Sequence, residues 1–103
     1  MLCKGSMEPT ISCDDLLVVY PPPFTDLNAG DTIIFWRQNS ICTGYVEGAS
    51  ILHRITRVTS SQGQGLAFET KGDANPRADA CTVLVTHVTG KVLAVIHDAR
   101  SPD

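Results

Sequence analysis

The sequence lacks several features that would assign it quickly to a class of proteins. None of its apolar runs approaches the roughly 18 residues needed to cross a bilayer, and no charged head followed by an apolar stretch marks a secretory signal. Charge of one sign is not gathered into runs, since 11 acidic and 8 basic residues are spread along the chain with a formal net charge of -3. Without a basic cluster to follow a phosphate backbone, the chain is not expected to bind nucleic acid.

Metal-ligand spacing is also missing. The four cysteines, Cys3, Cys13, Cys42 and Cys81, form no C-x-x-C pair and have no histidine pair near them. A zinc site therefore has little support, and the sequence predicts neither a metal nor a cofactor. The spacing leaves open whether the cysteines form disulfides.

The composition is that of a single folded domain. Of 103 residues, 43% are hydrophobic and 18% are charged, a balance typical of globular proteins rather than of disordered segments. The length allows one modest core, and no repeat or low-complexity segment divides the chain. Residues 1–103 are therefore expected to form one domain with one site.

Short apolar runs rich in β-branched residues alternate with segments rich in Pro, Gly, Asn, Asp and Ser. No window shows the sustained i, i+3, i+4, i+7 spacing of an amphipathic helix. The sequence thus predicts an all-β fold of short, mostly antiparallel strands. The expected strands are 15–20, 31–36, 50–58, 65–70 and 90–96.

The run "ILHRITRV" places a histidine among apolar neighbours. Strand alternation puts Ile51, His53 and Ile55 on one face, with Arg57 as a further candidate for that face. A single histidine in such a position is more often a packed structural residue than a catalytic one. The face alone therefore predicts burial of His53 and no particular chemistry.

Three segments together carry the parts of a nucleophilic site: "GSMEPT" at 5–10, "HRI" at 53–55 and "KGDANPRAD" at 71–79. A serine hydroxyl is a poor nucleophile until a base removes its proton, and histidine titrates near neutral pH. A carboxylate can then orient the imidazole. Each residue also has a structural interpretation, because Ser and Asp are common in turns next to Gly and Pro.

The chain resembles type I signal peptidases of the archaeal and endoplasmic-reticulum kind, which use histidine where the bacterial enzymes use lysine. The resemblance implies a signal-peptidase-like or repressor-protease-like β-fold. It also implies a serine endopeptidase that removes signal peptides from exported or secreted precursors by cutting after small residues. The segments that carry it, in the family's order, are "GSMEPT", "GDTIIF", "ILHRITRV", "TKGDAN" and "GKVLAVI".

The resemblance also suggests a role for each residue of the site. Ser6 corresponds to the nucleophile and His53 to the general base. Two aspartates match family spacings: Asp79 is the expected partner that orients His53, while Asp73 is expected to hold the turn or support the site. The geometry to look for is a carboxylate of Asp79 on one nitrogen of His53 and the hydroxyl of Ser6 on the other.

The implied substrate is an extended precursor that adds as a strand beside residues 2–6 and 51–53. Lys4, Gly5, Met7 and Leu52 are the residues expected to contact it. Lys4 departs from the family, whose members usually carry Ser or Gly at that position, where a hydroxyl can help to stabilise an oxyanion. Ala74 likewise replaces an asparagine of the usual Asp-Asn-Asn, and Asn75 is retained.

Family members are held to the membrane by an apolar N-terminal helix that ends just before the nucleophile, and this sequence begins five residues before Ser6. The expectation is a membrane-associated protein whose anchor is missing here, with its catalytic domain on the extracytoplasmic or lumenal face. Its partners would be signal-peptide-bearing precursors, with accessory subunits or a translocon beside it.

Two alternatives remain open at the level of the sequence. One is a catalytically inactive subunit of a secretion complex that binds precursors without cutting them. The other is a self-cleaving protease with a serine and a lysine, for which only Lys4, Lys71 and Lys91 are available.

Overall fold

A single antiparallel β-sheet of six strands contains nearly all the regular structure in the described part of the chain. The computed structural model describes residues 5–24, 26–36, 50–61, 63 and 65–97. The all-β prediction is confirmed. The strands are β1 (Leu16–Tyr20), β2 (Thr32–Trp36), β3 (Ser50–Ser61), β4 (Gly65–Lys71), β5 (Val83–Leu84) and β6 (Val88–Ile96), with one 3-10 turn, η1 (Val85–His87), before β6.

Five of these strands coincide with the predicted apolar runs to within a few residues. β3 continues beyond residue 58 because its far end pairs with β4 in a hairpin that closes at Ser61 and Gly65. β5 and η1 were not predicted, since a strand of two residues is too short to show any alternation.

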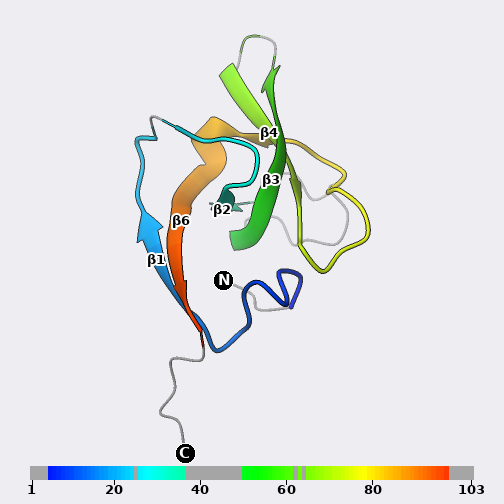
Figure 1. Cartoon of the computed structure of the whole chain (residues 1–103). Helices are drawn as coiled ribbons and strands as arrows, with labels where there is room; N and C mark the ends of the chain where they lie inside the picture. The colour runs from blue at the N-terminus through cyan, green and yellow to red at the C-terminus, as the bar shows by residue number, and fades with distance from the viewer. Residues whose placement is uncertain (1–4, 25, 37–49, 62, 64, 98–103) are drawn as a thin grey trace, which may run out of the picture.

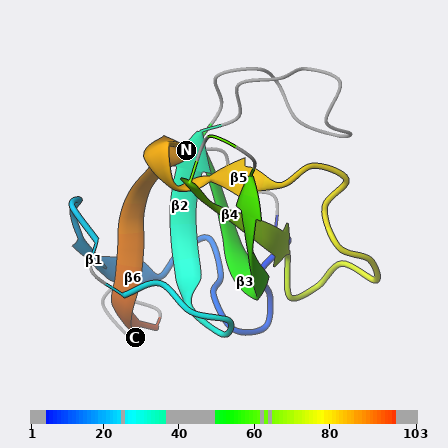
Figure 2. The ribbon, with the colours of Figure 1, turned by 90° about the horizontal axis from the view of Figure 1, so that it is seen from above.

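The strand order across the sheet is β1-β6-β2-β3-β4-β5, and each neighbouring pair is antiparallel. β1 and β6 lie side by side at one end of the sheet, and the β3–β4 hairpin lies toward the other end (Figure 1). Seen from above, β2 stands between β6 and β3 (Figure 2). The histidine strand β3 is therefore an inner strand, held by β2 along its first half and by β4 along its second.

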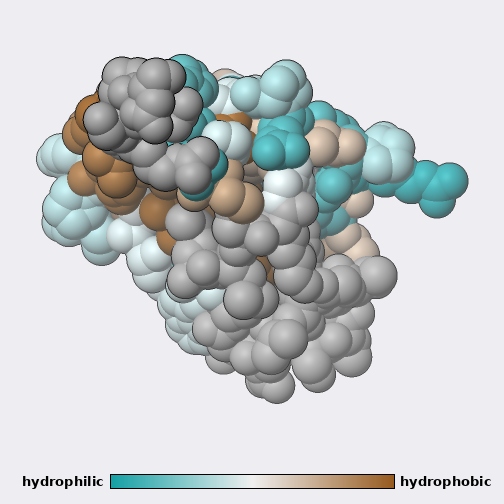
Figure 3. Space-filling view, turned by 90° about the horizontal axis from the view of Figure 1, so that it is seen from below, coloured by the Kyte–Doolittle hydropathy of each residue, from teal (hydrophilic) through white to brown (hydrophobic). Residues whose placement is uncertain are grey.

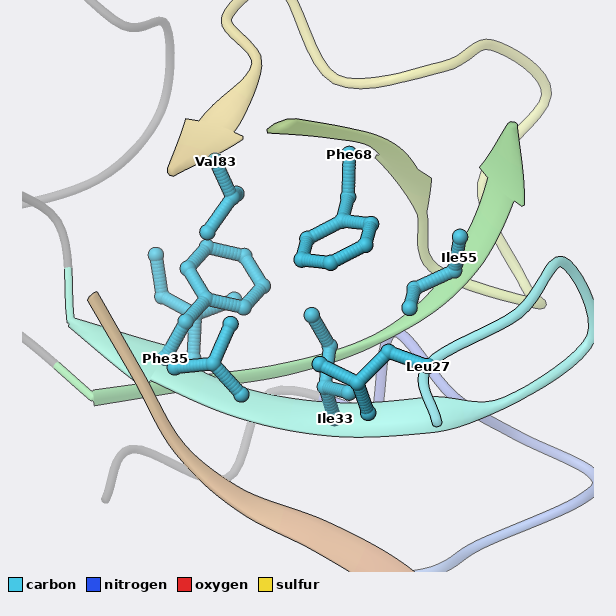
Figure 4. Packing of buried hydrophobic residues seen from close by; sticks show 8 residues of the cluster. Leu27, Ile33, Phe35, Ile55, Phe68 and Val83 are labelled. Carbon is cyan, nitrogen blue, oxygen red and sulfur yellow. The ribbon is translucent and has the colours of Figure 1, made fainter. Parts of the chain in front are cut away.

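The hydrophobic core lies against β2, β3 and β4 (Figure 4). In β3 the predicted alternation holds as far as Ile55, because Ile51, His53 and Ile55 are all buried. Arg57 does not continue the buried face: the register between β3 and β4 shifts after Ile55, and the Arg57 side chain is mostly exposed. The core cluster consists of Leu27, Ile33, Phe35, Ile51, Ile55, Phe68, Val83 and Val88.

Apolar surface gathers on the side of the molecule where β1 and β6 lie (Figure 3). The exposed large hydrophobic residues of these two strands are Leu16, Val18, Val19, Tyr20, Leu93 and Ile96. Among the described residues no helix is long and apolar enough to span a membrane.

Two of the four cysteines can be described. Cys13 and Cys81 are each disulfide-bonded, which answers for these two the question that the spacing of the cysteines left open. Cys81 follows the segment that carries Asp79, so its disulfide restrains the chain close to that aspartate.

Candidate active site

Ser6 lies at the start of a tight turn that two buried side chains anchor. Gly5 has a φ of 75°, which side chains other than glycine rarely adopt, and its carbonyl oxygen accepts a hydrogen bond of 3.1 Å from the amide of Glu8. The amide of Ile11 donates to the carbonyl of Met7 over 3.0 Å. Because Met7 and Ile11 are buried, the turn is held at both of these points.

The loop that follows β4 is bonded to this turn. The amide of Ala74 donates to the carbonyl oxygen of Ser6 over 2.7 Å, and the amide of Asp73 points to the sulfur of Met7 at 3.4 Å. The turn and the loop lie next to each other beside the start of β3 (Figure 1). Met7, expected to contact substrate, is 3% exposed, so its side chain supports the site from within.

His53 is fully buried on β3, and its ring meets the hydroxyl of Ser6. Ser6 Oγ lies 3.0 Å from His53 Nε2, a normal hydrogen-bond distance. The ring of Phe35, on the neighbouring strand, stands edge-on to the imidazole with the ring centroids 6.4 Å apart. Strand packing therefore fixes the position of the imidazole and leaves its Nε2 side facing the serine.

Asp79 occupies the other nitrogen of the same ring. His53 Nδ1 lies 2.6 Å from Asp79 Oδ2, and the aspartate side chain is 6% exposed. A carboxylate can only accept hydrogen bonds, so Nδ1 carries the proton and Nε2 is left to accept the proton of Ser6. Both contacts expected from the sequence are present, and together they form a continuous chain from hydroxyl to imidazole to carboxylate.

Asp73 is not brought to His53. Its carboxylate takes two hydrogen bonds from the guanidinium of Arg54, from Nε at 2.9 Å and from Nη2 at 2.7 Å, and a third from Thr10 Oγ1 at 2.6 Å. Arg54 also donates to the carbonyl of Gly30. Asp73 thus joins three segments of the protein without touching the imidazole, an arrangement that fits the supporting role expected for it.

Arg54 and Asp73 each stabilise the charged form of the other. The hydrogen bonds from Arg54 lower the pKa of Asp73 below its ordinary value, and the bond from Thr10 adds to this effect while partial burial opposes it. The same contact with Asp73 raises the pKa of Arg54. The ion pair is therefore present throughout the neutral pH range.

Gly72 makes room for the serine and the histidine. A Cβ at this position would lie 2.6 Å from the carbonyl oxygen of Ser6, 2.8 Å from Asn75 Nδ2 and 3.0 Å from His53 Nε2. Distances this short are not tolerated between non-bonded atoms, so a side chain here would displace the site. The glycine that directly precedes Asp73 in the sequence is therefore required for steric reasons.

Of the remaining residues expected to contact substrate, Leu52 and Gly5 can be described and Lys4 cannot. Leu52 is half-buried on β3 and pairs with Ile34 of β2. β4 pairs with β3 only from Arg54 onward, so no described strand covers the opposite edge of Ser50–His53. Ile55 bonds Asp31 and Gly30, just ahead of β2, through its own N–H and C=O. By strand alternation the N–H and C=O of Leu52 therefore face the uncovered edge. Gly5 adjoins Ser6 in the turn, and Lys4 lies outside the described residues.

The lysines that can be described do not take the place of the histidine. Lys71 Nζ donates to the carbonyl of Gly72, and Lys91 Nζ pairs with Asp31 at 3.4 Å. No group of three or more His, Cys, Asp or Glu residues that could hold a metal ion is found over the described ranges.

Reasoning from the sequence missed two contributors to the site. Thr70 donates from Oγ1 to Asp79 Oδ2 over 2.7 Å, and Arg54 pairs with Asp73. A signal for Thr70 was available: it alternates with Phe68 in an apolar strand, and a polar residue on a buried face needs a hydrogen-bond partner. No such signal identified Arg54, because an arginine on the outer face of a strand is ordinary.

Comparison with known proteins finds one informative likeness. The chain is 35% identical over 81 residues to Signal peptidase I W of Bacillus subtilis (strain 168), a match that covers 78% of this chain and 38% of the relative. The chain therefore spans less than half the length of the curated relative it matches. No protein-family model matches the chain, and no solved structure matches it. The fold, the site and this likeness together support a relationship with the type I signal peptidases, which are enzymes of signal-peptide processing.

Proposed function

We propose that this protein is a serine endopeptidase that removes signal peptides from exported or secreted precursors, with Ser6 as nucleophile, His53 as general base and Asp79 as the group that orients the base. The observation that carries the proposal is the pair of contacts on one imidazole, 3.0 Å to Ser6 Oγ and 2.6 Å to Asp79 Oδ2. The histidine-dependent subtype, expected from the resemblance, is part of the proposal.

In the proposed reaction the proton of the Ser6 hydroxyl passes to His53 Nε2 as the oxygen attacks the scissile carbonyl carbon. Positive charge then develops on the imidazole, and the carboxylate of Asp79 stabilises it in a site that water scarcely reaches. The imidazolium next donates its proton to the departing amine, leaving an acyl group on Ser6. Water, deprotonated by the same base, hydrolyses that ester and regenerates the hydroxyl.

The backbone amide of Ser6 is the proposed donor to the oxyanion. The family resemblance implies Ser or Gly two positions earlier, from where a hydroxyl can help to stabilise the oxyanion, and here that position is Lys4. An ammonium group can also stabilise a negative oxygen, so Lys4 is assigned to the oxyanion or to the substrate backbone beside it.

The substrate is proposed to bind as a strand against the uncovered edge of β3. The N–H and C=O of Leu52 would bond the precursor backbone, and Gly5 would border it on the other side. Main-chain bonds of this kind hold a substrate in extended form whatever its side chains. Specificity for small residues would then depend on shallow pockets beside Ser6.

A membrane-associated location is part of the same proposal. Its support is the likeness to a signal peptidase and the apolar surface on β1 and β6, which would meet the interfacial region of a bilayer. The catalytic domain would then face the extracytoplasmic or lumenal side, where precursors arrive. Accessory subunits or a translocon would be its protein partners.

Cleavage of a precursor peptide tests the proposal directly. The purified protein is incubated in detergent or lipid with a peptide that contains Ala-x-Ala, and the products are identified by mass spectrometry. We expect one cut after the second alanine with the wild type and none with Ser6→Ala, while Ser60→Ala, an exposed serine on β3, cuts normally. Binding of the peptide without any cut by the wild type would favour the inactive precursor-binding subunit instead.

A further inference from the structure

Asp79 is held through its carboxylate and through its backbone amide by one residue of β4. Thr70 Oγ1 donates to Asp79 Oδ2 over 2.7 Å, and the carbonyl oxygen of Thr70 accepts a hydrogen bond of 2.7 Å from the amide of Asp79. The oxygen that receives the threonine hydroxyl is the same Oδ2 that faces His53 Nδ1. Thr70 therefore fixes both the main chain and the side chain of Asp79.

The surroundings make this contact consequential. Thr70 and His53 are both fully buried, and the Asp79 side chain is 6% exposed, so little water can replace a lost hydrogen bond. A hydroxyl on the buried face of β4 would be costly without an acceptor, and Asp79 supplies one. The fold thus places a polar group in its interior at the one point where it touches the proposed acid.

We propose that Thr70 is a positioning residue that keeps Oδ2 of Asp79 aimed at His53 Nδ1 and thereby fixes the imidazole with Nε2 toward Ser6. The expected effect of Thr70 on turnover rests on the proposed function. Its expected effect on the orientation of the His53 ring does not. Without the hydroxyl, the carboxylate loses one of the contacts that orient it and turns more readily about its Cβ–Cγ bond, while the backbone bond from Asp79 to Thr70 remains. Removing the hydroxyl should therefore disturb the orientation of the carboxylate and leave the position of the loop unchanged.

Thr70→Val tests the proposal because valine keeps the shape of threonine and replaces only the hydroxyl, by a methyl group. We expect kcat for the precursor peptide to fall by roughly tenfold or more with KM unchanged, as follows from losing one hydrogen bond to a buried charged group. Thr70→Ser should recover most of the activity, since it restores the donor. Thr56→Val is the matched control, because Thr56 is an exposed threonine of β3 whose hydroxyl bonds Glu69 away from the site.

A second measurement does not depend on catalysis. The proton on His53 Nδ1 is followed by proton NMR in the whole protein, where a short bond to a carboxylate gives a resonance far downfield. We expect this resonance to move upfield and broaden in Thr70→Val and to stay in place in Thr70→Ser and Thr56→Val. If Thr70→Val does not fold, the pair Thr70→Ser and Thr70→Ala makes the same comparison with and without a hydroxyl.

The outcomes separate the two proposals. A wild type that cuts no precursor, but whose Nδ1 resonance moves upon Thr70→Val, would refute the protease and keep the positioning role. A wild type that cuts, with kcat and resonance both unchanged in Thr70→Val, would refute the positioning role and keep the protease. A loss of kcat in Thr70→Ser as large as that in Thr70→Val would show that restoring the hydroxyl does not restore turnover, and would also overturn the inference.

Discussion

The carbonyl oxygen of Ser6 accepts a hydrogen bond of 2.7 Å from the backbone amide of Ala74. This bond joins the turn that carries the proposed nucleophile to the loop that continues to Asp79. His53, on β3, lies between Ser6 and Asp79. The bond between Ser6 and Ala74 therefore helps to set the distance between the two ends of the hydroxyl-imidazole-carboxylate chain. Changes in the loop after β4 should therefore reach the serine.

Asp79→Asn should abolish most activity and leave the fold intact. The amide has nearly the same shape, but it presents a donor where His53 Nδ1 needs an acceptor, which favours the wrong tautomer. We expect kcat to fall by roughly 10³- to 10⁴-fold, with little change in the thermal unfolding midpoint. Asp26→Asn, an exposed aspartate far along the chain, is the control and should cut normally. Normal cleavage by Asp79→Asn would reduce the site to Ser6 and His53.

Asp73→Asn should lower stability in a pH-dependent way. Because the pKa of Asp73 is lowered in the folded protein, its contribution is complete above the unfolded-state value of about 3.9 and disappears as the pH falls through the lower folded-state value. We expect urea unfolding at pH 7 to show a loss of about 1–2 kcal/mol, limited by the partial exposure of Arg54. The difference from the wild type should shrink toward zero as the pH falls below the lowered folded-state pKa of Asp73.

Arg54→Met supplies the control for that experiment. It removes the partner of Asp73, so combining it with Asp73→Asn should cost less than the sum of the two single changes. A loss in Asp73→Asn that stays constant as the pH is lowered from 7 into the acid range would mean that the carboxylate charge is not what stabilises the loop.

Gly72→Ala should impair both catalysis and stability. The new Cβ would lie within 3.0 Å of His53 Nε2 and of the Ser6 carbonyl, so serine and histidine must move apart. We expect a destabilisation of about 1–3 kcal/mol and a loss of cleavage larger than the loss of folded protein explains. Gly90→Ala is a matched control, because its Cβ would clash with the side chain of Val19, away from the site. Equal activity per folded molecule in both variants would contradict the steric role of Gly72.

Leu93→Ser should weaken binding to lipid vesicles if the apolar surface on β1 and β6 meets the membrane. Leu93 is 57% exposed on β6, so the change removes apolar contact with little effect on packing. Cosedimentation with liposomes should fall for Leu93→Ser and more strongly for its combination with Leu16→Ser. Leu66→Ser is the control, since Leu66 is 47% exposed on β4. An equal decrease in all variants would show that the surface has no special part in binding.

The sequence by itself determined most of the strands and the burial of His53. Both depend on a period of two residues, which is local: in β3 the side chains of Ile51, His53 and Ile55 must share one face whatever else the chain does. Beyond Ile55 the alternation no longer predicts which side chains are buried, because the register between β3 and β4 shifts there. The motif around Ser6 could also be found from the sequence, because Gly5 and Pro9 mark a turn.

The family resemblance pointed to Asp79 as the partner of the imidazole, but the pattern of residues did not, and only the tertiary structure shows why Asp79 rather than Asp73 meets the ring. Asp73 and Asp79 follow β4 in a segment with no periodicity, so their directions are not encoded locally. Asp73 is drawn to Arg54, which points to the opposite face of β3 from His53, whereas the bonds from Asp79 to Thr70 turn its carboxylate toward the ring. The choice depends on partners from other strands, and such pairings exist only once the sheet has formed.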